Sequence, residues 1–461
     1  MQKELHFFNQ IVEKLLIDEE KNPVVKPIST DHVIDHLDLN FKDQGMDDDA
    51  WQRLIEKLMD FTPKTASKLF FNQLFGGRQP KAVVGDLLAV MLNNSMYTYK
   101  VAGPQAGIEK AIMHKVIQLI NYPETADGTI APGGSMCNFM GLVMARDAAI
   151  DSTRNEGVTT KMIVYTSAES HYSIPKNAAF AGIGRKQVRY IKANPLGQMD
   201  TQELELTIEK DLNAGHFPFF VNATAGTTVL GAFDTIGAIS EICKKYNLWL
   251  HVDGAYCGGV IFSQKYRSLV QGIELSDSFS FNAHKMLGTP LSCSIIIAKD
   301  KAHLSKSFSN DADYLYQTNT DEFDLGKTSI QCGRRNDALK FWTLWKSVGN
   351  NGLEKIIDHQ FYLADVARNY ITNHPDYTLY SHPNSISICF NYKAVPADKL
   401  CTLLYEDASA MVGYGKFQED EFVRLITINA NNTEKDILHF FQVLERGAKK
   451  IENNQTIASL A

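Results

Sequence analysis

The sequence has no long apolar run. No segment of its 461 residues reaches about 18 uninterrupted apolar residues, the length that a membrane-spanning helix needs. The N-terminal segment MQKELHFFNQIVEKLL has the spacing of an amphipathic helix and lacks the apolar core of a secretion signal. We therefore expect neither a membrane span nor a signal peptide.

An excess of basic residues is also missing. The chain carries 46 Lys and Arg against 53 Asp and Glu, which gives a formal net charge of -7. A chain with this balance has no general electrostatic attraction to nucleic acids or to anionic membranes, so we expect neither as a partner.

Cysteine usage and missing motifs exclude further classes. The seven cysteines are odd in number and form no C-x-x-C pair, which predicts free thiols in a reducing cytoplasm. No P-loop occurs, and no G-x-G-x-x-G follows a strand candidate, so a dinucleotide site is unsupported. The spacing of His32 and His36 could hold a metal, but the ordinary interpretation is a helix surface, and we predict no metal site.

The composition that remains, 44% hydrophobic and 21% charged, is that of a globular protein with room for a large core. Between residues 160 and 300, short apolar runs alternate with helical stretches. The runs that we interpret as strands are 161–167, 217–226, 248–256, 277–284 and 293–299, and 236–246 is a helix candidate. Near-continuous apolar strands separated by helices predict an α/β fold with a mostly parallel central sheet flanked by helices.

The pattern along the chain predicts three parts. Residues 1–90 form an N-terminal helical segment, and residues 91–350 form a large domain that contains the sheet. Residues 351–461 mix strand and helix patterns and form a small C-terminal α+β domain. In a parallel sheet, ligands bind beyond the carboxyl ends of the strands, so we look for chemistry there.

Three polar features follow strands or open a helix. Asp253 lies in the run LWLHVDGAY, Lys285 follows SFSFNAH, and Gly-Gly-Ser at 133–135 opens an apolar helix. Alone, such residues are more often caps or solvated side chains. Together they fit pyridoxal 5′-phosphate, which needs an amine for its aldehyde, a carboxylate for its pyridine nitrogen and N–H donors for its phosphate.

Six motifs then match a known family. The strings APGGSMCN, ESHYSIPKNAAFAGIG, TAGTTVLGAFD, LWLHVDGAYCGG, SFSFNAHKML and QCGRRNDALKFWTLWK resemble those of the group II pyridoxal-phosphate-dependent amino-acid decarboxylases, in the same order. The resemblance is greatest to the glutamate and cysteine-sulfinate decarboxylase branch. It implies a carboxy-lyase of fold type I, the aspartate aminotransferase-like fold. It also implies a homodimer, in which residues 1–90 pack against the partner and both chains contribute to each active site.

The resemblance also implies roles for single residues. Lys285 carries the cofactor covalently, and Asp253 pairs with its ring nitrogen. His171 stacks on one face of the ring, and Ala255 packs against the other. Thr224 lies near the phenolic oxygen.

The phosphate loop of the family matches Ser135, Met136 and Cys137, with Asn282 and His284 completing it. Relatives usually carry Ser where this chain has Cys137. Because a thiol is a weaker donor than a hydroxyl, we expect backbone amides to carry more of the phosphate contact.

Substrate choice depends on fewer matches. Gln73 and Arg424 match the residues that bind a side-chain acid, and Phe75, Ser95 and Tyr97 resemble the cysteine-sulfinate type. We therefore expect a small acidic amino acid: cysteine sulfinate, aspartate, cysteate or glutamate. The AGPQAG stretch at 102–107 departs from the family pattern, so an aromatic or basic substrate stays an alternative.

Phe323 stands where we align the loop tyrosine that protonates the product in this family. Phenylalanine cannot donate a proton. Either another group, such as His171, Lys285 or a neighbouring tyrosine, supplies it, or the reaction diverts to an aldehyde by oxidative deamination. Decarboxylation to the amine is our first expectation.

Overall fold

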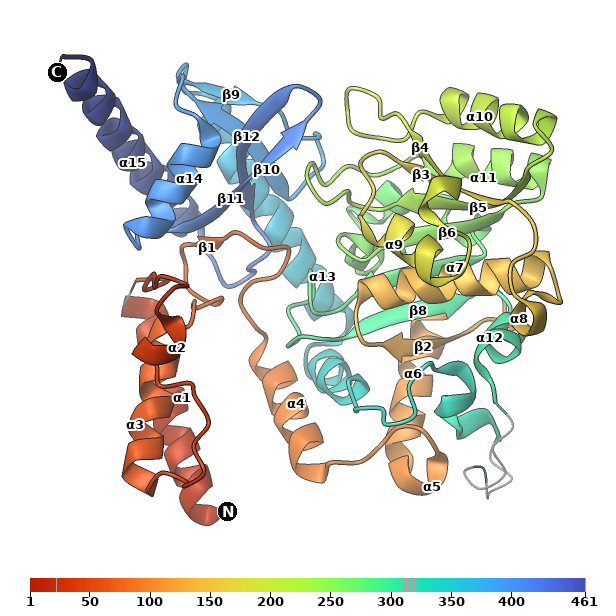
Figure 1. Cartoon of the computed structure of the whole chain (residues 1–461), viewed down its shortest axis with the longest axis horizontal. Helices are drawn as coiled ribbons and strands as arrows, with labels where there is room; N and C mark the ends of the chain where they lie inside the picture. Colours follow the sequence, from red (N-terminus) through yellow and green to blue (C-terminus); the bar gives the residue numbers. More distant parts are fainter. Residues whose placement is uncertain (22, 311–315, 317–320, 461) are drawn as a thin grey trace. The chain divides into compact units, whose positions relative to one another are not determined.

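The computed structural model describes residues 1–21, 23–310, 316 and 321–460 (Figure 1). Contacts divide the chain into two compact units. Unit 1 contains residues 1–77, 362–380 and 386–461, and unit 2 contains residues 78–361 and 381–385. The boundaries at 90 and 350 stay a prediction.

Unit 2 is built on a seven-stranded sheet with the order β2-β8-β7-β6-β5-β3-β4. Its strands are β2 (Asp127–Ala131), β3 (Met162–Ser167), β4 (Val188–Ile191), β5 (Phe217–Thr224), β6 (Trp249–Gly254), β7 (Ser278–Asn282) and β8 (Ser294–Ala298). Strands β7, β6, β5, β3 and β4 pair in parallel, and β8 runs antiparallel to both β7 and β2. The predicted mostly parallel sheet is therefore confirmed.

The strands of this sheet are apolar on both faces because helices cover both. Every residue of β3, β7 and β8 is buried. The helices of unit 2 are α4 (Pro80–Leu92), α5 (Tyr99–Ala102), α6 (Pro104–Leu119), α7 (Gly134–Ala149), α8 (Thr153–Glu156), α9 (Ser173–Phe180), α10 (Thr201–Asn213), α11 (Ile236–Tyr246) and α12 (Lys301–Phe308), with the first part of α13 (Ala338–Thr372).

Helix α7 crosses the sheet and has nearly no polar face. It contacts β5, β6, β7 and β8, and α9 and α12 pack beside it (Figure 1). One core cluster joins Leu142 of α7, Val164 of β3 and Phe220 of β5. Helices α10 and α11 pack on β5 and contact each other. The sheet and α7 thus form one packed core, which holds the residues at the strand ends in place.

Unit 1 joins the two ends of the chain. Its five-stranded sheet has the order β1-β11-β12-β10-β9, and β1 pairs in parallel with β11. Its strands are β1 (Phe70–Phe71), β9 (Tyr377–Leu379), β10 (Ser387–Tyr392), β11 (Met411–Phe417) and β12 (Asp420–Ile426). Its helices are α1 (Gln2–Lys21), α2 (Val33–His36), α3 (Asp48–Phe61), α14 (Ala397–Glu406), α15 (Glu434–Leu460) and the second part of α13.

Among the described residues, no helix is both long and apolar enough to cross a membrane. The same residues contain no group of three or more His, Cys, Asp and Glu side chains that could hold a metal. His36 instead lies edge-on to Phe61, with the ring centroids 5.4 Å apart.

Candidate active site

A cavity of about 210 Å³ lies at the carboxyl ends of the parallel strands of unit 2. Thr224 ends β5, Asp253 lies near the end of β6, and Asn282 ends β7. Thr224 and Asp253 are register partners on adjacent strands. The cavity is lined by Gly134, Ser135, Asn138, His171, Tyr172, Thr224, Gly226, Thr228, Asp253, Ala255, Tyr256, Asn282, His284 and Lys285.

Lys285 brings an amine to this cavity. It follows β7 in a turn whose backbone N–H donates to the Asn282 carbonyl at 3.1 Å. Its Nζ lies 5.9 Å from the centroid of the Tyr256 ring. Burial lowers the pKa of Lys285 below its ordinary value near 10.5, although the Asp253 carboxylate acts in the opposite direction. A lowered pKa increases the fraction of the neutral amine, and the neutral amine is the form that attacks an aldehyde carbon.

Asp253 is a buried carboxylate held by two donors. Its Oδ1 accepts from the backbone N–H of Ala255 at 3.0 Å, and its Oδ2 accepts from Asn138 Nδ2 at 2.7 Å. Each carboxylate oxygen has two lone pairs, so capacity for a ring N–H of a ligand remains. Asp253 is thus both fixed in place and able to accept.

His171 lies between the end of β3 and the start of α9 and is half-buried. Its Nδ1 accepts from the backbone N–H of Ser173 at 3.2 Å and lies 2.9 Å from Ser173 Oγ. Burial lowers the pKa of His171, Asp253 raises it, and Lys285 lowers it further. The Tyr172 ring packs against it, with the centroids 4.1 Å apart.

The N-terminus of α7 opens onto the same cavity. The first N–H groups of a helix have no partner within the helix, and they favour an anion. Asn177 Nδ2 fixes this turn by donating to the Ser135 carbonyl at 2.8 Å. His284 Nδ1 accepts from the backbone N–H of Cys293 at 2.9 Å, and burial lowers the pKa of His284 to about 4.

Two predicted phosphate residues do not line the cavity. The Cys137 side chain is buried in a core cluster with Met140 and Met144, and Met136 packs against the same cluster. Burial raises the pKa of the Cys137 thiol well above its ordinary value. The backbone N–H groups of both residues donate to the Gly133 carbonyl, at 3.0 and 3.1 Å. The phosphate roles of their side chains stay a prediction.

The cavity fits pyridoxal phosphate by its donor set and its shape. Asn282 Oδ1 is a buried acceptor that has no hydrogen-bond partner among the described residues. A Cβ added at Gly134 would lie 2.9 Å from the Ala255 Cβ and 2.9 Å from Asn282 Nδ2, so a glycine keeps this side of the cavity open. An amine, a carboxylate and a helix N-terminus therefore converge on one space.

Sequence reasoning missed several lining residues, among them Asn138. It lies three residues after Ser135 and four after Gly134 on α7, so helical periodicity alone puts it on the same face. Tyr172 and Tyr256 each follow a predicted site residue directly, which was the available signal for them.

The predicted acid-binding residues lie in unit 1. Gln73 and Arg424 line one cavity of about 360 Å³, beside Asn72 and Gly413. Arg424 Nη2 donates to the Asn72 carbonyl at 3.5 Å, and Arg424 is the register partner of Gly413 across β11 and β12. The unit therefore brings these two residues together.

Phe75 also lies in unit 1, where its ring is 6.3 Å from that of Phe70.

The other residues predicted to select the substrate lie in unit 2. Ser95 Oγ accepts a hydrogen bond from the backbone N–H of Arg334 at 3.3 Å. Tyr97 stacks on Tyr316, with centroids 5.8 Å apart. Phe323 packs against Tyr99, 5.7 Å away between centroids, and joins a small core cluster around Met96.

Comparisons with known proteins agree with this chemistry. The model of the family described as "Pyridoxal-dependent decarboxylase conserved domain" matches residues 32–393. Cysteine sulfinic acid decarboxylase of Homo sapiens is 35% identical over 439 residues, which cover 89% of this chain and 88% of that protein. Acidic amino acid decarboxylase GADL1 of Xenopus tropicalis is 34% identical over 434 residues, 89% of this chain and 85% of that protein.

Solved structures share the fold. The crystal structure of mouse CSAD superposes with a TM-score of 0.91 at 31% identity and covers 96% of this chain and 97% of that one. The crystal structure of Oryza sativa TDC with PLP and tryptamine has a TM-score of 0.91 at 23% identity over 98% of both chains. The predicted fold type I is thus confirmed. The chain belongs to the pyridoxal-dependent decarboxylase family and is an amino-acid decarboxylase that uses pyridoxal phosphate.

Proposed function

We propose that the protein converts a small acidic L-amino acid to its amine and carbon dioxide, with cysteine sulfinate, aspartate, cysteate and glutamate as the candidate substrates. The observation that carries the proposal is the cavity in which Lys285, Asp253 and His171 meet beside the N-terminus of α7. Relatives named for cysteine sulfinic acid and for acidic amino acids, at 34 to 35% identity, support the acidic class.

Each group of the cavity has a proposed task. Lys285 Nζ would hold the cofactor. Asp253 stabilises a proton on the ring nitrogen, and His171 and Ala255 orient the ring from its two faces. When bound, pyridoxal phosphate takes up the electron pair that the Cα–carboxylate bond releases.

The remaining cofactor contacts hold the phosphate and the ring oxygen. Ser135 and the N-terminus of α7 would hold the phosphate, with Asn282 and His284 beside them. Thr224 contacts the phenolic oxygen. The product still needs a proton at Cα, and Lys285 Nζ, His171 Nε2 and the Tyr172 hydroxyl are the cavity groups that can carry one.

Substrate selection is proposed to depend on Arg424 and Gln73. A guanidinium donates two parallel hydrogen bonds to a carboxylate or sulfinate, which a shorter or uncharged side chain does not reproduce. The shared cavity of about 360 Å³ in unit 1 supports joint binding by the two residues. Phe75, Ser95 and Tyr97 are proposed to restrict the length of the substrate.

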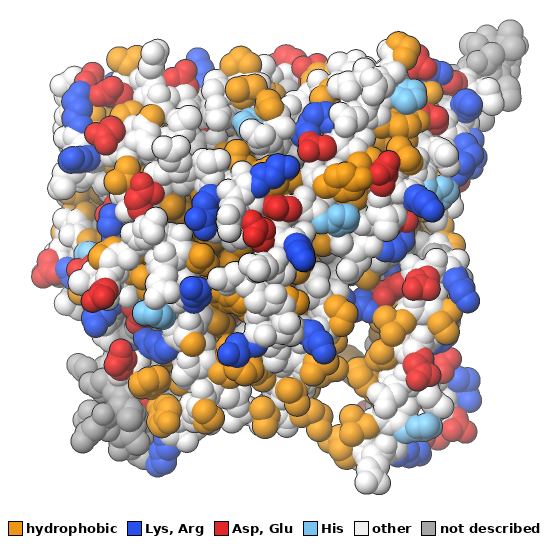
Figure 2. Space-filling view, turned by 180° about the vertical axis from the view of Figure 1, so that it is seen from behind, with side chains coloured by type: hydrophobic (Ala, Val, Ile, Leu, Met, Phe, Trp, Pro, Cys, Tyr) orange, Lys and Arg blue, Asp and Glu red, His pale blue; other side chains and the backbone are white. Residues whose placement is uncertain are grey.

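A homodimer is part of the proposal. Helix α4 buries Ala82, Gly85 and Ala89 and leaves its other side apolar and exposed. Its exposed apolar side chains are Val84, Leu87, Leu88, Val90, Met91 and Leu92. Hydrophobic side chains gather along the lower edge of Figure 2, the edge at which Figure 1 draws α4. An exposed apolar patch of this kind is typical of a protein interface.

A cytoplasmic location is also proposed. All seven cysteines are free thiols, and six of them are buried. Free cysteines are typical of a reducing compartment.

The proposal is tested with the purified holoenzyme and a panel of acidic, aromatic and basic amino acids. We expect carbon dioxide release from cysteine sulfinate, aspartate or cysteate, with an equal yield of amine. Release only from aromatic or basic substrates contradicts the acidic class. Aldehyde with stoichiometric hydrogen peroxide in place of amine contradicts simple decarboxylation and supports the effect of Phe323.

Arg424→Ala tests the substrate site separately. We expect kcat/KM for the acidic substrate to fall about ten- to hundredfold, because a hydrogen bond to a charged group is lost. Arg424→Lys keeps the charge but not the fork, so its loss is intermediate. Arg185→Ala removes an exposed arginine elsewhere and serves as the control. Unchanged turnover by Arg424→Ala contradicts the assignment.

A further inference from the structure

We infer that Asn138 is a positioning residue whose single amide holds the Asp253 carboxylate in place and, through Ser173, fixes the tautomer of His171. The inference deepens the proposed function, because it rests on the proposed roles of Asp253 and His171 toward the cofactor. The geometry of one buried hydrogen-bond network carries it.

Asn138 is the centre of this network. It lies on α7 and is 1% exposed. Its Nδ2 donates to Asp253 Oδ2 at 2.7 Å and to Ser173 Oγ at 3.1 Å. Its Oδ1 lies 3.1 Å from His251 Nε2. A primary amide has two N–H donors and one acceptor oxygen, so all of its polar groups are in use.

The Asp253 carboxylate determines which way the amide points. An ionised carboxylate only accepts hydrogen bonds, so the NH₂ group of Asn138 must face it. A reversed amide would put two oxygens 2.7 Å apart without a hydrogen between them. The amide oxygen therefore faces His251, and because that oxygen only accepts, His251 Nε2 must carry the proton.

The proton on Nε2 also decides the role of Nδ1, on the far side of the His251 ring. Burial lowers the pKa of His251 to about 4, so the ring is neutral at pH 7 and has a single N–H. Its Nδ1 must then accept, and Ser278 Oγ, 2.8 Å away, must donate. Ser278 Oγ accepts in turn from Trp249 Nε1 at 2.9 Å. Every donor from Trp249 onward points toward Asp253, which stabilises its negative charge.

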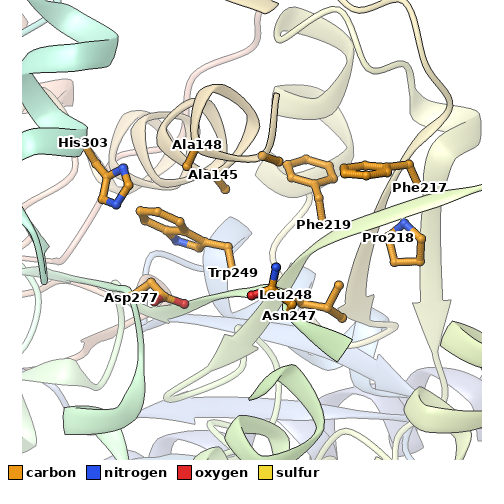
Figure 3. A pocket seen from close by; sticks show the side chains of 11 residues that line it. Ala145, Ala148, Phe217, Pro218, Phe219, Asn247, Leu248, Trp249, Asp277 and His303 are labelled. Atoms are coloured by element: carbon orange, nitrogen blue, oxygen red, sulfur yellow. The ribbon is translucent and has the colours of Figure 1, made fainter. Parts of the chain in front are cut away.

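Trp249 begins this chain at a second cavity of about 320 Å³, at the other ends of the strands. Figure 3 shows it beside His303, and the two rings are edge-on with centroids 4.9 Å apart. The network therefore runs from one end of the strands to the other, and Asn138 is the residue through which it reaches the cofactor cavity.

A second branch leads from Asn138 to His171. Ser173 Oγ accepts the other amide hydrogen, so the Ser173 hydroxyl can donate its own hydrogen to His171 Nδ1 at 2.9 Å. The backbone N–H of Ser173 donates to the same nitrogen at 3.2 Å. With Nδ1 accepting, the proton of the neutral His171 ring lies on Nε2.

Asp253 has several titratable neighbours. Lys285 follows β7, His171 precedes α9, His251 lies on β6 and Cys137 lies on α7, and the charge of Asp253 acts on each of them. Asn138 is uncharged, so it supplies a donor to the carboxylate without changing this charge balance. Replacing it tests the network without removing any of these groups.

The experiment compares Asn138→Asp and Asn138→Ala with the matched control Asn222→Asp. Asn222 is also fully buried, on β5, and donates to Thr166 Oγ1 at 3.1 Å and to Thr224 Oγ1 at 3.4 Å. For each holoenzyme we would measure the pH dependence of the cofactor's visible absorption and of kcat. The affinity of each apoenzyme for pyridoxal phosphate gives a readout that needs no turnover.

Asn138→Asp is expected to create a titration step that the wild type and Asn222→Asp lack. Two carboxyl groups in hydrogen-bond contact cannot both ionise, so they share a proton and titrate as a pair. Asn138→Ala adds no charge and is expected to lack the step. It should lower cofactor affinity and kcat about ten- to hundredfold, with KM nearly unchanged, because a donor to a charged group is lost.

Ser173→Ala separates the two branches. It removes the hydroxyl between Asn138 and His171 and leaves the contact with Asp253. Imidazole nitrogen chemical shifts of histidine-labelled apoenzyme report the tautomer, and His171→Asn assigns the signal. We expect the Nε2–H tautomer of His171 in the wild type. In Ser173→Ala and Asn138→Ala the hydroxyl is absent or no longer oriented by the amide, and the backbone N–H at 3.2 Å is the donor that remains, so we expect a larger share of the Nδ1–H tautomer. The cofactor titration of Ser173→Ala should be unchanged.

A wild-type pH profile for Asn138→Asp, or a wild-type His171 tautomer in Asn138→Ala, would overturn the inference. If Asn138→Asp does not fold, Asn138→Ala and Ser173→Ala decide it. Failure of the proposed function is distinguishable, because the wild type itself would then fail to bind the cofactor at Lys285 or to release carbon dioxide.

Discussion

At the scale of single residues, His251 links the site to the acid stability of the fold. Burial lowers its pKa from 6.5 to about 4, so the folded state keeps the ring neutral. The stabilisation is fully present above the unfolded-state pKa of 6.5, and it is lost as the pH falls through the folded-state pKa of about 4.

His251→Gln should remove this part of the pH dependence. Between pH 7 and pH 4 we expect the free energy of unfolding of the wild type to fall by on the order of 3 kcal/mol more than that of His251→Gln. Urea unfolding at several pH values measures the difference. Parallel curves for the two proteins would show that His251 titrates normally in the folded state.

The residues that we propose to carry the chemistry could be predicted from the sequence to different degrees. Lys285, Asp253 and His171 stand at strand ends in recognisable motifs, and the cavity contains all three. Asn138 stands in an apolar helix, where its sequence context indicates only a buried residue. Its meaning depends on Asp253 and Ser173, which are 115 and 35 residues away in the chain. Such a pairing is visible only after folding.

At the scale of elements, the close packing of α7 on β6 decides whether the network forms. A Cβ added at Gly141 would lie 2.8 Å from His251 Nδ1 and 3.0 Å from its Cε1. These contacts are with a fully buried ring, so one of the two elements must shift. Glycine is therefore needed at this crossing for its small size.

Gly141→Ala is expected to lower the free energy of unfolding by about 1–3 kcal/mol, the typical cost of overpacking a core. Gly107→Ala in α6 is the matched control, because nothing lies within 4 Å of its added Cβ. That variant should gain up to about 1 kcal/mol from helix propensity. Thermal or chemical unfolding checks both, and equal effects of the two substitutions would rule out the steric argument.

Prediction of elements succeeded where the apolar runs were long. The helix predicted at 236–246 coincides with α11, and the five strand candidates correspond to β3, β5, β6, β7 and β8. Strands β2 and β4 were not predicted. β2 begins Asp-Gly-Thr, and β4 has two polar or exposed residues among its four, so neither has a continuous apolar run.

At the scale of the whole molecule, the exposed apolar side of α4 is the feature that supports the proposed homodimer. Leu88→Glu puts a charge on this side, where Leu88 is 47% exposed in the single chain. We expect the variant to sediment with the 51.6 kDa mass of one chain and the wild type with twice that mass. Leu206→Glu, at a 67% exposed leucine of α10, should remain a dimer. A dimeric Leu88→Glu would contradict this interface.

Unit 1 shows what the sequence could not predict at this scale. It joins residues 1–77 to the C-terminal region, and β1 pairs with β11 about 340 residues later in the chain. A two-residue strand such as Phe70–Phe71 carries no periodic signal, so only the folded sheet reveals the pairing.

We propose that the cavity around Lys285 holds the cofactor of this decarboxylase. Borohydride reduction of the holoenzyme, followed by peptide mass spectrometry, tests it most directly, because reduction makes the bond between cofactor and lysine permanent. We predict one pyridoxyl group per chain, on Lys285, and no pyridoxyl group in Lys285→Ala. A label on another lysine, or a labelled Lys285→Ala protein, would contradict this role of Lys285.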